Sequence, residues 1–450
     1  MATRTVSLVA GGVLLLTAVS ASAQAPASRP ERPYRGVYAG GTDDAQQVLT
    51  VNGSVASGYD TDVLLGAREA GLQPGAVPYA SGEGRYNQFG GGLTYTSDLD
   101  RLLVGASLSS MLRQYPGLDT SLVSSHAGSG GVSLTLGKNR QTTIEGRGSV
   151  TFQSLGAFLP FASFGDPILG QLPAPGQDFG GARTKYFRYS SSAGITQKLS
   201  RRATLSASYH RDVSDFTSGA QGLDQQSVAV RFTRGLSRYL SLRVGYGLTS
   251  AAYQYLVNGR DYQYHNIDTG VDYSRDLSLT RRTKLAFSTG AAAIREGQTT
   301  RYDVIGSASL NREIGRTWNA LVAYHRNAGF IETIGVPTFS DSISASIDGL
   351  VSNRLSFRAG VGASRGNVGY TTTAVTRDGF DAVTGFAGLS RALTRNLALG
   401  LNYTYYRYNF EDAAVFVTPL QPRVNRHSVN VTLSAWAPVF KHGRKPNVTR

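Results

Sequence analysis

Cysteine is absent from all 450 residues, so no disulfide framework, thiolate metal site or cysteine nucleophile is available. Histidine is scarce as well, with six residues, and no cluster of His, Asp and Glu has the spacing of a metal site. After the first residues, no apolar run reaches the roughly 20 residues that a membrane-spanning helix needs. The sequence therefore excludes disulfide-stapled folds and helical membrane proteins, and it predicts neither a metal nor a cofactor.

Lysine is rare too, because it supplies only six of the 45 basic residues; the others are arginines. The formal net charge of +15 could suggest nucleic acid as a partner. That function needs basic residues clustered on a recognisable binding module, whereas these arginines are dispersed among Gly, Ser, Thr and Tyr. We therefore predict no nucleic-acid partner, and expect the guanidinium groups to meet phosphate or carboxylate groups.

The chain begins with the features of a secretory signal. A short basic start at Arg4 precedes an apolar run over residues 6–19, and the small-x-small motif "ASA" ends at Ala23. We predict that residues 1–23 are cleaved as a signal peptide and that the mature protein is exported. Residues 24–46 are expected to form a short periplasmic segment, too short for a plug domain.

Most of the remaining chain alternates between apolar and small polar residues. The stretch "LALGLNYTYYRYNF" (residues 397–410) has this period of two, which is typical of a β-strand whose two faces meet different surroundings. The stretches "LSLRVGYGL" (240–248) and "LSFRAGVGA" (355–363) repeat it. Short polar turns separate pairs of such stretches, at residues 96–101, 137–141, 200–202, 237–239, 280–282, 315–317, 352–354 and 394–396. The pattern predicts antiparallel hairpins joined by longer loops.

The expected strands, of about 11–14 residues, are longer than those of soluble sandwiches and suit a tilted crossing of an outer membrane. Two strands for each turn and one strand at either end give about 18 strands. The fold class that we predict is all-β, a transmembrane antiparallel up-and-down β-barrel over residues 47–440. A soluble solenoid or sandwich is the alternative. An interfacial girdle of aromatic residues is expected at Tyr209, Tyr253, Tyr324, Tyr405, Trp318 and Trp436.

These features resemble outer-membrane β-barrel porins and, more loosely, the beta-barrel porin 2 type that is found beside polysaccharide genes. The stretch "SVNVTLSAWAPVF" (residues 428–440) resembles the last strand that the barrel assembly machinery recognises, with Phe440 as its closing aromatic. Residues 441–450 follow it and depart from that pattern; we expect a basic periplasmic tail. The resemblance implies location in the bacterial outer membrane, with membrane lipids, lipopolysaccharide, the assembly machinery and further copies of the chain as partners.

Strand phase assigns each charged residue to the lipid face or to the lumen. The basic residues expected to line the pore are Arg147, Arg188, Arg231, Arg243 and Arg358, and the acidic ones are Glu145, Asp268, Asp272, Asp303 and Asp348. Basic residues come mainly from the middle strands and acidic ones from the next few. Adjacent arcs of opposite sign would place a transverse field across the pore and screen solutes by charge. The alternative is that these charges neutralise one another across the wall.

A second set of arginines ends strands in phase with the apolar face. A cation near the membrane interface costs only about 0–1 kcal/mol, and lipid phosphates are suitable partners there. We therefore expect this set to anchor the barrel at its outer rim. Its members are Arg211, Arg295, Arg326, Arg365 and Arg407.

The third long loop, residues 154–184, is unusually apolar for a loop. Its sequence "LGAFLPFASFGDPILGQLPAPG" contains Phe158, Phe161, Phe164 and Asp166. Long loops are usually functional or disordered, and so much apolar surface argues against solvated disorder. We expect the loop to fold into the barrel as a constriction. A lid over neighbouring loops or a contact between subunits is the alternative.

These features favour a channel for passive diffusion of small hydrophilic solutes, with a weak preference for anions. The alternatives are a dedicated barrel for polysaccharide export or uptake, which would favour a lumenal aromatic track, and a closed structural barrel. The aromatic candidates for such a track are Tyr186, Phe386 and Tyr406. An enzyme is not predicted, because Ser206, His210 and Asp212 lie on one short strand that cannot converge them as a catalytic triad.

Overall fold

The computed structural model describes residues 45–64, 81–99, 101–114, 116, 122–136, 141–153, 186–216, 222–237, 240–253, 261–273, 283–296, 299–330, 337–368, 378–410 and 423–444. The predicted signal peptide, the third long loop and the last six residues of the predicted tail lie outside this set. Within it, no helix has the length and apolar character that crossing a bilayer requires.

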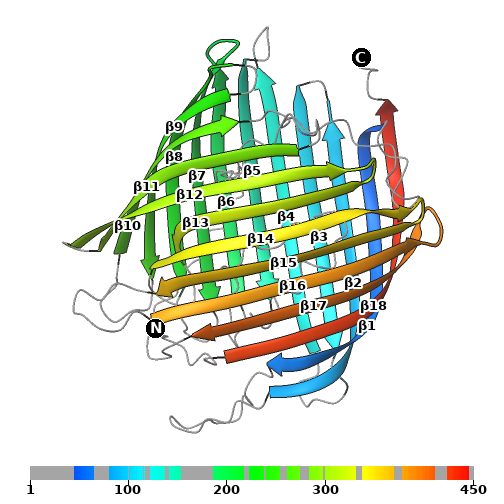
Figure 1. Ribbon diagram of the computed structural model, residues 1–450. Helices are drawn as coiled ribbons and strands as arrows, with labels where there is room; N and C mark the ends of the chain where they lie inside the picture. Colours follow the sequence, from blue (N-terminus) through cyan, green and yellow to red (C-terminus); the bar gives the residue numbers. More distant parts are fainter. Residues whose placement is uncertain are drawn as a thin grey trace, which may run out of the picture.

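The described chain forms 18 strands that run alternately in opposite directions (Figure 1). The odd-numbered strands are β1 (Ala45–Leu64), β3 (Leu102–Gln114), β5 (Thr142–Gln153), β7 (Ala203–Phe216), β9 (Leu240–Tyr253), β11 (Thr283–Glu296), β13 (Trp318–Phe330), β15 (Leu355–Val368) and β17 (Leu397–Phe410). The even-numbered strands are β2 (Ser81–Asp98), β4 (Leu122–Leu136), β6 (Tyr186–Lys198), β8 (Leu223–Gly235), β10 (Asp261–Tyr273), β12 (Thr299–Ile314), β14 (Pro337–Ser352), β16 (Asp378–Ala392) and β18 (Arg423–Arg444).

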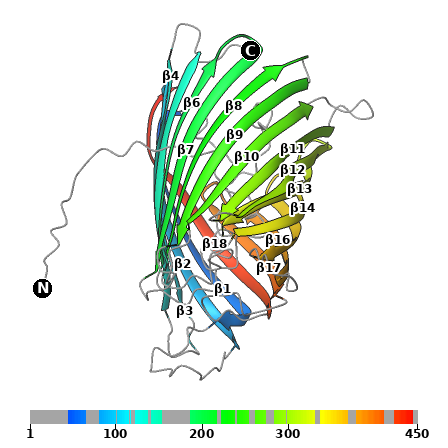
Figure 2. The ribbon, with the colours of Figure 1, turned by 90° about the vertical axis from the view of Figure 1, so that its left-hand side faces the viewer.

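Each strand pairs antiparallel with its neighbours in sequence, and β1 also pairs with β18. That last pairing closes the sheet into a barrel, which confirms the predicted fold class and strand number. The strands are strongly tilted, so those of opposite walls cross one another in both views (Figures 1 and 2). Such a tilt is a geometric requirement of closing a sheet.

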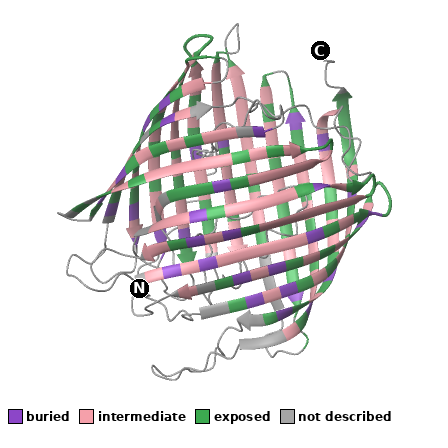
Figure 3. Ribbon diagram, in the orientation of Figure 1, coloured by how far each residue is buried: buried purple, intermediate pink, exposed green. Residues whose placement is uncertain are grey.

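The two faces of the barrel wall differ in the way that the alternating pattern predicts. Large apolar side chains such as Val55, Leu108 and Val361 are 53%, 61% and 51% exposed on the outward face. At intervening positions, Ala56 and Gly362 are buried, and buried, intermediate and exposed residues intermix along the strands (Figure 3). Exposed apolar side chains around a closed cylinder form the lipid-facing band of a membrane barrel.

Three of the short turns share one sequence motif, Leu-Ser/Thr-Arg, at residues 199–203, 236–240 and 393–397. In each turn the backbone N–H of the leucine donates to the carbonyl four residues later, over 2.8–2.9 Å. The hydroxyl of the Ser or Thr then accepts a bond from a backbone N–H two or three residues on. A hydroxyl that satisfies a turn N–H stabilises the chain reversal locally, so these turns follow directly from their residues.

Strands β1, β2 and β18 have 20, 18 and 22 residues and are longer than the expected strands. The end of the barrel predicted at Phe440 is wrong, because β18 continues to Arg444. The physical reason is pairing: β1 begins at Ala45, and its first residues supply partners for Arg444, His442 and Lys441. The end of the last strand is thus set by the start of the first.

Two members of the expected aromatic girdle face inward instead. Tyr253 is 1% exposed, because outward-facing Tyr246 and Leu248 fix the phase of β9 and place Tyr253 on the other face. Trp436 is 8% exposed and lies opposite Asn52. A rule based on residue type alone therefore misplaced both side chains, whereas strand phase places them correctly.

Strands β12 and β13 separate before they end. Their pairing stops at Gly306 and Arg326, although β12 extends back to Thr299 and β13 extends on to Phe330. In Figure 1 the β11–β12 hairpin reaches further to the left than β13 does. We call this separation the fork.

Side chains satisfy the backbone groups that the fork leaves without a strand partner. Arg326 Nε donates to the carbonyl of Val304 over 2.9 Å, and Asp303 Oδ1 accepts the N–H of Val304 over 2.8 Å. The Arg326 guanidinium also pairs with Asp303 at 3.0 Å and with Asp341 at 3.5 Å. An unsatisfied backbone group in a membrane costs several kcal/mol, so these contacts stabilise the fork.

One buried ion pair joins the two ends of the barrel wall. Arg426 on β18 donates to Asp60 on β1, with Nε 2.8 Å from Oδ1 and Nη2 in contact with Oδ2. Both side chains are almost fully buried, with 2% and 0% exposure. Two parallel bonds between a guanidinium and a carboxylate fix orientation as well as distance, so this pair secures the closing seam.

Replacing Arg426 with methionine would remove the guanidinium group that forms the ion pair with the buried Asp60 carboxylate. We expect the free energy of unfolding to fall by about 3–5 kcal/mol, as when one partner of a buried ion pair is removed. Urea titration of the refolded barrel, followed by tryptophan fluorescence, measures the change. The matched control is Arg188→Met, whose ion pair with Asp212 is partly exposed and should contribute about 1 kcal/mol or less. Equal losses in the two variants would contradict the prediction.

Engineered cysteines can test the fork without background, because the chain has no native cysteine. If β12 and β13 stayed paired beyond Gly306 and Arg326, Val304 would lie opposite Ala328. Leu310 and Val322 lie opposite each other in the part of the two strands that is paired. We expect Leu310→Cys with Val322→Cys to form a disulfide under mild oxidation, and Val304→Cys with Ala328→Cys to do so at least about tenfold more slowly, since a disulfide requires close Cα atoms. Mass spectrometry of the digested protein measures both rates, and similar rates would show that the fork is closed.

Candidate channel lumen

Strand register places all ten predicted charged positions on the inward face. On β5 and β6, Arg147 lies opposite Ser192, and Arg188 lies opposite Thr151. The remaining register partners are also inward-facing: Ser206 for Arg231, Gly270 for Arg243, Asp348 for Arg358, Ser133 for Glu145, Gly290 for Asp268, Ser241 for Asp272 and Ala292 for Asp303. The side chains of Asp268 and Asp272 lie outside the described set.

Glycines beside the arginines give the guanidinium groups room along the wall. A Cβ added to Gly131 would lie 2.8 Å from Cγ of Arg147, and one added to Gly270 would lie 3.0 Å from Nη2 of Arg243. Each glycine is the direct register neighbour of its arginine. The sequence signal for this arrangement is an inward glycine opposite an inward arginine, and it becomes visible only when the register is known.

The basic residues differ in their access to the lumen. Arg147 and Lys198 are exposed, and the Arg188 side chain is 45% exposed. Arg231 is half-buried, and Arg243 is only 3% exposed. Of the predicted basic set, the exposed members Arg147 and Arg188 lie on the adjacent strands β5 and β6, whereas Arg358 is half-buried.

Asp212 sits between two basic groups of this region. Its Oδ1 accepts from Arg188 Nε over 3.3 Å, and its Oδ2 contacts His210 Nε2. His210 Nδ1 is buried and makes no hydrogen bond to a described residue. The sequence predicts that one strand cannot bring Ser206, His210 and Asp212 together as a triad, and Ser206 Oγ bonds to the carbonyl of Arg231 over 3.5 Å. The three residues do not form a triad, and Asp212 instead orients Arg188.

Two of the predicted acidic residues already face cations of the wall. Asp303 is ion-paired with Arg326 at the fork, which the sequence did not predict because Arg326 belongs to the outward face. Asp348 is exposed and lies directly opposite Arg358 in the register of β14 and β15. The Asp303–Arg326 ion pair offsets one charge of the predicted acidic set.

The inward face also carries buried groups that the sequence reasoning missed. Arg113 lies 4.3 Å above the ring of Tyr86 and donates to Gln88 Oε1 over 2.7 and 3.0 Å. Tyr86 is 1% exposed, and its hydroxyl is 3.1 Å from Ser428 Oγ. The phase of β3, which places Ser107 and Ser109 inward, could have identified Arg113 as an inward residue.

A second buried patch on the inward face consists of Leu223, Ala251, Tyr253 and Tyr262. The rings of Tyr253 and Tyr262 meet edge to face with centroids 6.0 Å apart. Such packing is apolar, in contrast to the exposed Arg147 and Arg188 on β5 and β6. The inward face is therefore divided into packed sectors and a basic, water-accessible sector. The predicted constriction residues Phe158, Phe161, Phe164 and Asp166 lie outside the described residues.

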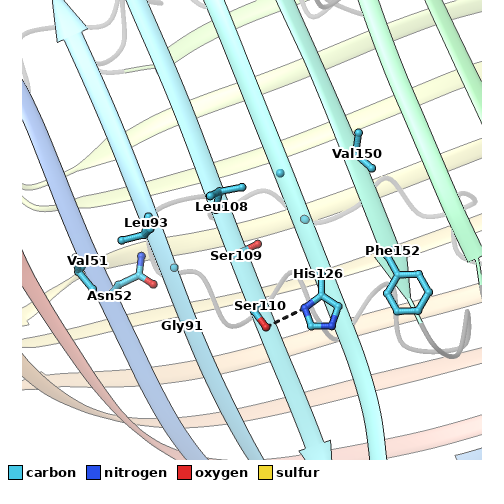
Figure 4. A pocket seen from close by; sticks show the side chains of 13 residues that line it. Val51, Asn52, Gly91, Leu93, Leu108, Ser109, Ser110, His126, Val150 and Phe152 are labelled. Atoms are coloured by element: carbon cyan, nitrogen blue, oxygen red, sulfur yellow. Dashed lines mark hydrogen bonds between the residues drawn. The ribbon is translucent and has the colours of Figure 1, made fainter. Parts of the chain in front are cut away.

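The outward face of β1–β5 bears a shallow hollow of roughly 530 Å³ (Figure 4). Leu93, Leu108 and Val150 border it, and Ser110 Oγ and His126 Nδ1 meet at 2.9 Å within it. Because this hollow opens to the lipid side, it is separate from the lumen. Its apolar lining suits hydrocarbon and not a hydrophilic solute.

Comparisons with solved structures return outer-membrane barrels at low similarity. OpdQ of Pseudomonas aeruginosa is 10% identical, with 88% of this chain and 98% of that chain covered and a TM-score of 0.44. A BenF-like porin from Pseudomonas fluorescens gives 10% identity, coverage of 87% and 99%, and a TM-score of 0.44. The FrpB iron transporter from Neisseria meningitidis is 7% identical, with 88% of this chain and 82% of that chain covered and a TM-score of 0.46. No protein-family model and no curated protein matches the sequence.

TM-scores of this size do not identify a solute or a mechanism. We therefore assign the class of the protein from the geometry of its own barrel. A closed antiparallel barrel satisfies its backbone hydrogen bonds between strands, and its outward face is apolar. Those are the properties of an integral β-barrel of the bacterial outer membrane.

Cysteine accessibility tests the division of the inward face. We expect Arg147→Cys and Arg188→Cys to react readily with a water-soluble methanethiosulfonate, and Arg243→Cys to react at least about tenfold more slowly, because thiol modification requires exposure. Val361→Cys, on the lipid face, is the control and should prefer a lipophilic maleimide. Modification rates are read by mass spectrometry. Equal rates at positions 147 and 243 would contradict the division.

Proposed function

We propose that this outer-membrane barrel is a channel for passive diffusion of small hydrophilic solutes, with a weak preference for anions. The observation that carries the proposal is the exposure of Arg147 and Arg188 on adjacent strands of the inward face. Lys198, also exposed, adds a third cation on β6. An anion that enters the lumen would meet these groups, of which Arg188 shares its charge with Asp212 through an ion pair of 3.3 Å. Asp303 is ion-paired with Arg326.

The proposed selectivity is electrostatic and does not require a tight binding site. Cationic groups along a narrow water-filled path raise the local concentration of anions, and conduction requires that binding remain weak enough for release. The half-buried Glu145, on the same strand as Arg147, moderates the positive potential. A modest anion preference is therefore expected, and not exclusion of cations.

The third long loop is part of the same proposal. We infer that residues 154–184 fold inward and narrow the channel, because their apolar side chains would otherwise be exposed to water. Phe158, Phe161 and Phe164 would pack against the wall, and Asp166 would face the basic sector. The loop connects β5 to β6, the two strands that carry Arg147 and Arg188, so its ends lie beside that sector.

A polysaccharide barrel remains the second candidate. It would be favoured by an exposed aromatic track, but Tyr406 is 6% exposed and Phe386 is half-buried, while the Tyr186 side chain lies outside the described set. We also propose that lipopolysaccharide and the assembly machinery, the latter through β18, are partners of the barrel, and that copies of the chain associate.

Planar-bilayer recordings test the channel. We expect stable single-channel conductance and an anion-leaning reversal potential in a salt gradient. Replacing Arg147 and Arg188 together with glutamate should lower the ratio of anion to cation permeability several-fold, because two cations become two anions in the accessible sector. Arg211→Gln, on the outward face, is the matched control and should leave the ratio unchanged. An equal change in both would contradict selectivity at the inward site.

Deletion of residues 157–175 tests the loop in the same recordings. Conductance that rises on deletion supports a channel narrowed by its loop. Conductance that is present only after deletion would mark the loop as a gate and favour the dedicated polysaccharide barrel. Silence in both forms would overturn the open channel and leave a plugged or structural barrel.

A further inference from the structure

The outward face of β13–β16, four strands that lie side by side (Figure 1), carries a row of charges whose sign alternates. In the strand register, Asp341 on β14 lies between Arg326 on β13 and Arg365 on β15. Arg365 in turn lies opposite Asp381 on β16. Four neighbouring strands thus present a cation, an anion, a cation and an anion in one line. We call these four residues the alternating row.

A corresponding line of outward residues elsewhere on the wall lacks this pattern. From Arg211 on β7, the register continues with Gln226 on β8, Ser250 on β9 and Gln263 on β10. All three of these residues are uncharged. Alternation of sign therefore distinguishes β13–β16 from β8–β10.

The two central members of the alternating row are available at the surface. Arg365 is exposed and makes no hydrogen bond or ion pair with another described residue. The side chain of Asp341 is 47% exposed, although it contacts Arg326 at 3.5 Å. At one end of the row, Asp381 Oδ1 accepts a bond from Asn409 Nδ2 over 3.3 Å. The centre therefore offers one cation and one anion, side by side, to a partner outside the barrel.

The surroundings of Arg365 determine which partner suits it. A phosphate group bound to this guanidinium would lie beside the carboxylates of Asp341 and Asp381, its two register neighbours, and would be repelled by them. A suitable partner instead brings a carboxylate to Arg365 and a cation to Asp341. A second copy of this chain carries both groups at the same spacing.

Membrane insertion restricts how two copies can meet. Both copies cross the membrane in the same direction, so a twofold axis that relates them runs along the membrane normal. If this axis passes between β14 and β15, rotation reverses the order of the alternating row. Asp341 of one copy then faces the partner's Arg365, and Arg365 faces the partner's Asp341. The row is thus complementary in charge to its own rotated copy.

The next line of outward residues is complementary in size. Ile343 on β14 is 54% exposed and lies opposite Ala363 on β15. The same rotation places the large side chain of Ile343 against the partner's small Ala363. Because barrel strands are tilted from the membrane normal, the β14–β15 hairpins of the two copies cross each other. Contact is therefore concentrated in these two lines, close to the axis.

We propose that the outward face of β14–β15 is the interface of a dimer with twofold symmetry, formed by a second copy of this chain. Two reciprocal Asp341–Arg365 ion pairs join the copies, and Ile343 packs beside them. Complementary charges of this kind fix the register of an interface and disfavour other partners. The inference rests on the association of copies proposed above, and it names the surface involved.

Cross-linking in intact outer membranes tests the surface without detergent. The chain has no native cysteine, so Ile343→Cys can be treated with a short, membrane-permeant bis-maleimide. The matched control is Val228→Cys on β8, another outward position that is 49% exposed. We expect at least about tenfold more linked dimer from Ile343→Cys, because a link between thiols requires close approach of the two chains. Denaturing gels measure the linked fraction.

Charge reversal tests the ion pairs. Arg365→Asp and Asp341→Arg each bring like charges together across the axis and should raise the dissociation constant of the dimer at least about tenfold. Mixing the two variants should restore a dimer of one copy of each, because positions 341 and 365 are then both acidic in one copy and both basic in the other. Native mass spectrometry measures these species, and heat-modifiable migration confirms folding. Arg211→Asp is the control and should remain dimeric.

Several results would overturn the proposed interface. They are equal linking at positions 343 and 228, linking at neither position, and failure of the mixed variants to pair. Linking at position 228 alone would show that copies associate through another face, which overturns this surface and leaves association itself intact. An unchanged dimer together with lower retention of anionic phospholipid by Arg365→Asp would identify lipid as the occupant. Conductance does not enter these measurements, so they do not depend on the channel function.

Discussion

The structure depends on one constraint, that every backbone N–H and C=O within the membrane must find a partner in the protein. Closure of β1 against β18 meets this constraint for the two strands that would otherwise be edges. The Asp60–Arg426 pair lies at that seam and is buried, so closure is strengthened where the two ends of the chain meet. At the fork the strands do not pair, and Arg326 and Asp303 satisfy Val304 in their place.

Much of the fold could be predicted from the sequence because its determinants are local. Alternation with a period of two assigns faces within each strand, and the Leu-Ser/Thr-Arg turns carry their own hydrogen bonds. The same phase puts the predicted charged residues on the inward face. Tyr253 and Trp436 were misplaced by their residue type, although the phase of their strands already placed them inward.

The remaining features depend on contacts between distant parts of the chain. The end of β18 at Arg444 follows from the start of β1 at Ala45, almost 400 residues earlier. Arg243 and Arg188 have equivalent positions in the strand pattern, yet one is buried and the other exposed. Burial of this kind is decided by what packs over a side chain inside the barrel. Period and composition carry no information about that packing.

The topology also has a consequence for how such a barrel can vary. Among the described residues, every strand pairs with its neighbours in the sequence, and only the β1–β18 pairing joins remote segments. The wall is thus a linear series of hairpins closed once. Duplication or loss of one hairpin would change the circumference by two strands and require only one strand interface to be rebuilt. A chain of this design can change the width of its pore while the other hairpins keep their turns, registers and face patterns, which gives pore size an evolutionary freedom that a layered globular core lacks.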